Sequence, residues 1–224
     1  IDTYKDFLTK YPRDPQSVQV AQLLQMAYYK PGKSPEDIDA LTKGQTKNPV
    51  LVDVYWEEGA KLYNEKDYPK ARELFEKIIF NFPTSSLAPQ ASFYRSEALF
   101  LEEKYQEAAV AYEGFLQSYK EDAQRNLAMF HLAVSRYNLK QFPEAAQTFE
   151  LFAQTFPKDP LAQNASLNAA LSYIQAQNVD EAIDAVQSYA TAFPNAEDLG
   201  TAYLQLGQFL EKLGQEQKAA EIYR

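Results

Sequence analysis

The fold of this chain is decided by a pattern that is complete in the stretch Phe142-Pro-Glu-Ala-Ala-Gln-Thr-Phe-Glu-Leu-Phe-Ala-Gln-Thr-Phe-Pro157. Its first alanine belongs to a column of alanines that recur every 37 residues: Ala71, Ala108, Ala145, Ala182 and Ala219. A fixed period of this length is typical of proteins built from stacked structural repeats. The period therefore predicts the architecture and moves the functional question from a catalytic pocket to a surface.

Neighbouring columns keep the same spacing. Four residues after each alanine stands an apolar or aromatic residue: Phe75, Tyr112, Phe149, Val186 and Tyr223. Twelve residues before each alanine stands a small residue: Gly59, Ser96, Ala133, Ala170 and Gly207. A proline closes most units, at Pro83, Pro157 and Pro194, with Lys120 at the equivalent place in one unit, and Pro49 extends the series backwards by a step of 34 residues. Because proline ends a helix but is tolerated in its first turn, each unit is predicted to contain two helices.

These columns give the expected domain organisation. Residues 1–12 match the end of a preceding repeat, 13–49 a degenerate repeat, and 195–224 a truncated repeat; the full repeats are 50–83, 84–120, 121–157 and 158–194. In the first full repeat we expect helices at about 50–64 and 69–82. The chain begins and ends inside repeats, which indicates a fragment of a longer protein.

The proline- and glycine-rich segment 31–49 is the irregular part of the chain. The sequence Ser34-Pro35-Glu36-Asp37 reads as a helix start, so we expect a short helix near 35–43 between mobile loops. The segment is interpreted as a degenerate repeat without a special role, and a specific role stays as the alternative.

Composition excludes several functional classes. The formal charge is −9 and the pI is near 4.8, whereas nucleic-acid binding needs clustered lysine and arginine. The chain has no cysteine and one histidine, so we expect no metal site, no cofactor and no catalytic residues. His131 is predicted to serve packing or the surface. No apolar stretch is long enough to span a membrane.

The sequence of small residue, aromatic, alanine, aromatic and proline resembles the tetratricopeptide repeat; it is carried here by Gly59, Tyr68, Ala71, Phe75 and Pro83. The resemblance implies an all-α fold, a right-handed α-solenoid of helix-turn-helix repeats, and binding of protein partners without catalysis. Two phrases, Phe82-Pro-Thr-Ser-Ser-Leu-Ala-Pro-Gln-Ala91 and Phe156-Pro-Lys-Asp-Pro-Leu-Ala-Gln-Asn-Ala165, are similar to the bacterial envelope branch of that family. This branch includes the lipoprotein subunit of the outer-membrane β-barrel assembly machinery and the Tol-associated coordinator of envelope constriction. It implies a periplasmic scaffold whose partners are components of envelope or outer-membrane complexes.

The candidate partner-binding residues lie on the first helices. Two columns seven residues apart share one helix face, and their aromatic members are Trp56, Tyr63, Phe93, Phe100, Phe130 and Tyr137. The resemblance implies that this face lines a concave groove. Either a protein segment binds these rings, or adjacent helices bury them against one another. An alternative function is a module that senses a peptide or small molecule within a larger regulatory protein.

Overall fold

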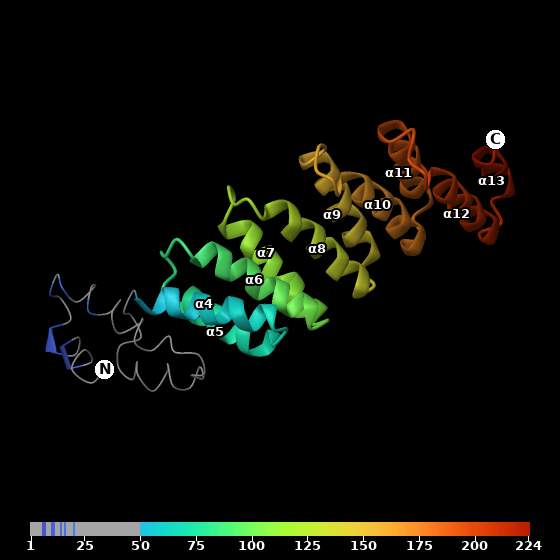
Figure 1. The fold of residues 1–224 in the computed structure, drawn as a ribbon. Helices are drawn as coiled ribbons and strands as arrows, with labels where there is room; N and C mark the ends of the chain where they lie inside the picture. The colour runs from blue at the N-terminus through green and yellow to red at the C-terminus, as the bar shows by residue number, and fades with distance from the viewer. Residues whose placement is uncertain (1–5, 8–9, 12–13, 15, 17–19, 21–49) are drawn as a thin grey trace. The chain divides into compact units, whose positions relative to one another are not determined.

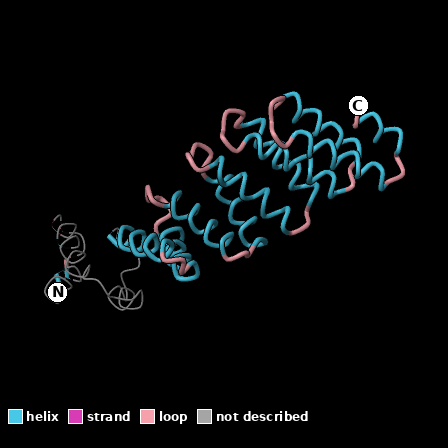
Figure 2. Tube along the Cα trace, turned by 45° about the vertical axis from the view of Figure 1, so that its right-hand side comes forward, coloured by secondary structure: helices cyan, strands magenta, loops and turns pink. Residues whose placement is uncertain are grey.

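Helices fill the chain from residue 50 onward in the computed structural model, which describes residues 6–7, 10–11, 14, 16, 20 and 50–224 (Figures 1 and 2). They are α4 (Val50–Asn64), α5 (Tyr68–Asn81), α6 (Ala88–Leu101), α7 (Tyr105–Ser118), α8 (Arg125–Asn138), α9 (Phe142–Thr155), α10 (Ala162–Ala176), α11 (Val179–Ala192), α12 (Leu199–Lys212) and α13 (Glu216–Ile222). No strand occurs among the described residues. The predicted all-α class is confirmed, and the helices of the first full repeat fall within one residue of the expected bounds.

The expected short helix at 35–43 and the expected mobility of 31–49 lie outside the described residues. The chain divides into two compact units, residues 1–98 and 99–224, and the boundary falls inside α6. The repeat boundaries drawn from the sequence remain a prediction.

Proline starts two of the second helices where the sequence indicated, and an aspartate caps one of them. Pro69 and Pro143 occupy the first turns of α5 and α9, where the missing N–H leaves no bond unmade. Asp67 caps α5, because its carboxylate accepts a hydrogen bond from the backbone N–H of Lys70 at 3.4 Å and a second from the Lys70 side chain at 2.8 Å. The Lys70 side chain accordingly holds the pKa of the Asp67 carboxyl below its usual value.

The turn inside each repeat contains one residue in the left-handed region, again at intervals of 37: Lys66, Glu103, Lys140, Gln177 and Gly214, with φ between 58° and 70°. In one of these turns the N–H of Lys140 donates to the carbonyl of Tyr137, and the N–H of Gln141 donates to the carbonyl of Arg136, each at 2.9 Å. This pair of bonds is the Schellman arrangement, which satisfies carbonyls at a helix end. Four of the five positions lack glycine, so each of them bears the steric strain of a left-handed side chain.

The core of the first unit forms where α4 and α5 pack against each other and against the start of α6. Phe75 is fully buried there, beside Leu74 and Ile78. An added Cβ at Gly59 would stand 2.9 Å from the Phe75 ring, so the two helices approach as closely as the small column predicts.

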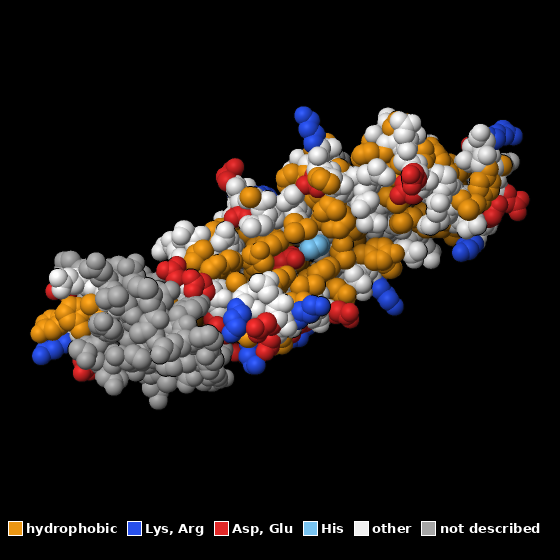
Figure 3. All heavy atoms as spheres, in the orientation of Figure 1, with side chains coloured by type: hydrophobic (Ala, Val, Ile, Leu, Met, Phe, Trp, Pro, Cys, Tyr) orange, Lys and Arg blue, Asp and Glu red, His pale blue; other side chains and the backbone are white. Residues whose placement is uncertain are grey.

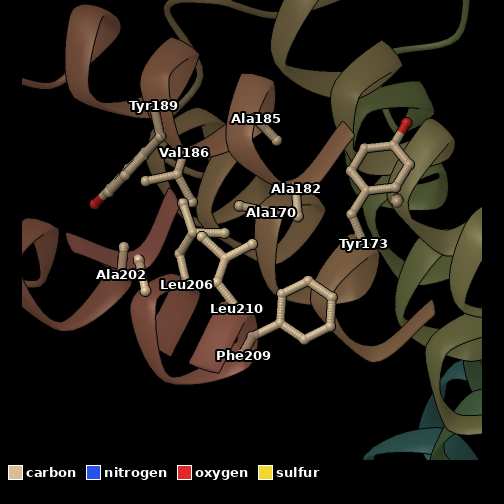
Figure 4. Packing of buried hydrophobic residues seen from close by; sticks show 12 residues of the cluster. Ala170, Tyr173, Ala182, Ala185, Val186, Tyr189, Ala202, Leu206, Phe209 and Leu210 are labelled. Atoms are coloured by element: carbon tan, nitrogen blue, oxygen red, sulfur yellow. The ribbon is translucent and has the colours of Figure 1, made fainter. Parts of the chain in front are cut away.

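In the second unit the helices pack in chain order, α7 on α8, α8 on α9 and so on to α13, with α10 also touching α12. The alanine column is enclosed: Ala108, Ala145 and Ala182 have no exposed surface and Ala219 has 1 %. Figure 4 shows the last of the cores, where Leu206 and Leu210 of α12 meet Val186 of α11. Small side chains let the backbones approach, and the large ones fill the remaining space.

Candidate functional site: a face of aromatic side chains

The six candidate rings are divided between the two units. Trp56, Tyr63 and Phe93 belong to the first unit, and Phe100, Phe130 and Tyr137 belong to the second.

In the first unit the rings gather around Tyr94 of α6. Its ring centroid lies 5.6 Å from that of Trp56 and 5.2 Å from that of Tyr63, both in edge-on geometry. Phe93 meets the same ring edge-on at 5.5 Å, and only 4 % of Phe93 is exposed. Trp56 and Tyr63 are half-buried. Phe93 is thus a core residue of this cluster, while the other two rings retain accessible surface.

Sequence reasoning missed Tyr94. It lies one position after Phe93, outside both columns, and the only available signal was its place in an aromatic pair.

An acidic side chain stands beside these rings. Glu97 of α6 is only 7 % exposed. Burial raises the pKa of the Tyr63 hydroxyl above its usual value, and the negative charge of Glu97 adds to the effect. The Tyr63 hydroxyl is therefore neutral at physiological pH.

In the second unit the centre of the ring cluster is His131. Its imidazole stacks on Phe100 with a centroid distance of 4.6 Å and an interplanar angle of 4°. The Tyr112 hydroxyl lies 3.4 Å from its Nδ1, and Phe130 meets it edge-on at 6.2 Å. Figure 3 shows the histidine, in pale blue, at the surface with hydrophobic side chains beside it. His131 packs within an aromatic cluster, in agreement with the packing role predicted from its neighbours.

Phe130 and Tyr137 differ in their exposure. Phe130 packs edge-on against Phe149 and Phe152 of α9, at 5.4 and 5.6 Å. Tyr137 is 36 % exposed and contacts Phe142 at the start of α9. Both interpretations of these rings, burial between helices and exposure to a partner, therefore apply to the same residues, since each side chain is buried on one side and accessible on the other.

The remaining columns continue this face along the second unit. Leu167 and Ile174 of α10 are partly buried, whereas Leu204 of α12 is 49 % exposed.

The described part of the chain shows neither a candidate metal site nor a candidate membrane-spanning helix. None of its histidines, aspartates and glutamates form a group that could hold a metal ion. No helix in residues 50–224 is long and apolar enough to cross a membrane.

Comparison with known proteins identifies the repeat. The family model described as Tetratricopeptide repeat matches residues 57–123, 103–160 and 132–197, which together span more than half of the chain. A search of curated proteins gave no significant match.

Solved structures share the fold at low sequence identity. MamA from Desulfovibrio magneticus RS-1 is 16 % identical with a TM-score of 0.58, over 77 % of this chain and 91 % of that one. YrrB, described as a tetratricopeptide protein with an unusual peptide-binding site, is 17 % identical with a TM-score of 0.58, over 83 % and 87 %. The kinesin light chain-like repeats of Podosopora anserina are 17 % identical with a TM-score of 0.53, over 77 % and 91 %. At this level of identity, these structures support the repeat fold alone.

Proposed function

We propose, from the premise that this chain belongs to the tetratricopeptide repeat family, that its aromatic face binds a segment of a partner protein. The protein then acts as a non-catalytic scaffold. The observation that carries the proposal is the partial exposure of ring side chains at repeated positions of the first helices, above all Tyr137 at 36 %. Half-buried aromatic side chains are held by the fold and still offer contact area at little entropic cost, which is why they dominate binding hot spots.

Further support comes from the charge of the chain and from one structural relative. The net charge of −9 would attract a segment with basic residues, so association should weaken as salt is added. YrrB is named for a peptide-binding site, and its shared fold makes a peptide segment a reasonable ligand class for this chain.

We also propose that the scaffold works in a bacterial envelope assembly, with envelope or outer-membrane components as partners. The support is the similarity of the phrases at 82–91 and 156–165 to the envelope branch of the family. Osmotic-shock fractionation of cells that express the full-length gene product tests it: release with the periplasmic fraction is expected, and retention in the cytoplasm would refute the location.

The binding test uses single substitutions on and off the face. Trp56→Ala and Phe130→Ala should each weaken partner binding by about 2 kcal/mol, or roughly thirtyfold, if these rings are anchors. Tyr137→Ala is the safer variant for folding, since this ring is the most exposed of the six. Matched controls are Phe80→Ala and Leu151→Ala, which truncate apolar side chains that are 72 % and 51 % exposed on second helices.

Partners would be recovered from native extract on each immobilised variant and quantified by mass spectrometry, after melting curves establish that the variants are folded. Proteins that bind the native chain and both controls, but not the face variants, would identify the partner. Equal recovery on all variants would move the binding site away from the aromatic face.

A further inference from the structure

A groove of about 430 Å³ lies within the second unit, apart from the aromatic rings. It runs between the second helices α9 and α11, and its floor is the first half of α10. This volume is within the range of sites that hold small ligands or side chains of a bound peptide. Glu150, Ala153, Ser166, Ala169, Ser188 and Tyr189 contribute to its walls and floor.

Small residues line the groove at positions where the preceding repeat has large ones. Four small residues that line the groove have large apolar residues at the equivalent positions 37 residues earlier. The equivalent pairs are Ala153 and Leu116, Ser166 and Met129, Ala169 and Leu132, and Ser188 and Leu151. Met129 and Leu132 are 7 % and 4 % exposed, so in that repeat the side chains themselves occupy the core. The lining between α9 and α11 thus differs from that of the preceding repeat, although one repeat earlier the positions of Ser166 and Ser188 also hold small residues, Ser92 and Gly114.

The charge at the groove departs from the pattern as well. Glu76, Glu113 and Glu150 form one column with a 37-residue spacing. The carboxylate of Glu76 pairs with Arg95 at 2.8 Å, and that of Glu113 pairs with Arg136 at 2.6 Å. In the two earlier repeats this carboxylate is therefore neutralised by an arginine from the next first helix.

Glu150 has a different partner. Its carboxylate accepts a hydrogen bond from the Tyr173 hydroxyl at 3.0 Å, and no lysine or arginine of the described residues pairs with it. Burial and the Glu150 carboxylate raise the pKa of Tyr173 to about 12, so this hydroxyl stays neutral at pH 7 and leaves the negative charge of Glu150 uncompensated. A half-buried carboxylate without a cation favours a cationic ligand group.

We propose that this groove binds an arginine side chain on a segment of a partner protein, with the guanidinium paired to Glu150 and the aliphatic stem over Ala153, Ser166 and Ala169. The chain itself uses arginine for the same carboxylate in both earlier repeats. A planar guanidinium can donate two hydrogen bonds to one carboxylate, and its stem can cover apolar surface. This site is separate from the aromatic face and does not depend on the function proposed for that face.

The test uses two blocked peptides, acetyl-Ala-Leu-Arg-Leu-Ala-amide and the same sequence with citrulline in place of arginine. Citrulline keeps the length and most hydrogen-bonding groups but removes the charge. Titration of the whole ¹⁵N-labelled chain, followed by amide shifts, should show saturable changes at Ser166 and Ser188 with the arginine peptide. The citrulline peptide should bind about tenfold more weakly or not at all.

Three variants assign the effect to the groove. Glu150→Gln should weaken binding of the arginine peptide about tenfold, whereas Glu144→Gln removes the same charge from an exposed site on the same helix and should leave binding unchanged. Ser188→Leu restores the residue of the preceding repeat at an exposed position and should obstruct the groove while the chain stays folded.

Several outcomes would overturn the proposal: equal affinity for the two peptides, equal losses in the two glutamine variants, or no saturable shift in the groove. Trp56→Ala should bind the arginine peptide as the native chain does. Failure of the groove and failure of the aromatic face can therefore be told apart.

Discussion

Ala145→Leu tests whether the repeat columns mark real close approaches between helices. Ala145 has no exposed surface, and it packs in one cluster with Ala133, Phe149 and Phe152, which are all buried. If space were available, three added carbon atoms would stabilise the fold by about 2 kcal/mol, at about 0.8 kcal/mol for each buried group. If the space is filled, overpacking destabilises it by about 1–3 kcal/mol. The change in unfolding free energy therefore has opposite signs in the two cases.

The structure favours the second case. The small column in the first unit is so tight that an added Cβ at Gly59 would meet the Phe75 ring at 2.9 Å. We therefore expect Ala145→Leu to lower the unfolding free energy by about 1–3 kcal/mol and the Tm by about 2–12 °C for a chain of this size. Gln147→Leu, at an exposed position of the same helix, serves as the control and should change stability by less than about 0.5 kcal/mol.

Urea unfolding followed by circular dichroism measures both variants. A stability of Ala145→Leu equal to or above that of the native chain would refute the close packing of α9 at this position. A large loss of stability in Gln147→Leu would show that an added leucine destabilises this helix even at an exposed position.

Three further predictions concern the turns, the glycines and the tyrosines. Lys140→Gly should stabilise the chain by about 0.5–1 kcal/mol in urea unfolding, because glycine removes the strain of the left-handed backbone at φ 61°; a loss of stability would contradict this. Gly59→Ala should destabilise the fold by about 1–3 kcal/mol, because the added Cβ meets the buried Phe75 ring, which cannot move away. Gly207→Ala should destabilise it less, because there the Cβ meets the exposed Tyr223 side chain, which can move aside. Equal melting temperatures of the two variants would refute this contrast. Burial raises the pKa of Tyr173 and Tyr189 to about 12 from 10 in the unfolded chain, so their contribution to stability is complete below pH 10 and is lost as the pH rises through 12; the urea midpoint should fall over this interval, and less so in Tyr189→Phe.

The sequence predicted the helices because the columns report which residues must be small. Ala71, Ala108 and Ala182 recur at a spacing that no single helix explains, and each is fully enclosed in the structure. Proline at 69 and 143 then fixed the start of two second helices. These signals are local and steric, so they can be read from one chain without an alignment.

The positions of the turns could be predicted from the sequence, but their backbone conformation could not. Lys66, Glu103, Lys140 and Gln177 adopt the left-handed conformation without the glycine that usually indicates it. Backbone bonds to the end of the preceding helix hold these residues there, and such bonds leave no mark on residue type. Only Gly214 carried a readable signal.

The candidate site shows the same limit. Periodicity placed six rings on one helix face but could not separate Phe93, which is 4 % exposed, from Tyr137, which is 36 % exposed. Exposure depends on what the neighbouring repeat places opposite each ring. Tyr94, which contacts Trp56 and Tyr63, lies outside the columns altogether.

Departures from the repeat are therefore where function is best sought, because positions that obey the pattern are already explained by packing. Glu113 obeys it: an arginine of the next helix pairs with it, and large side chains fill the space nearby. Glu150 departs from it in charge, since its partner is a neutral hydroxyl, and a groove lined by small residues lies beside it. Packing alone would favour refilling this space, because buried apolar groups stabilise the fold. A carboxylate without a cationic partner and a groove meet at Glu150, which is the reason to expect a ligand there, and a ligand with the arginine chemistry that the chain itself supplies to Glu113.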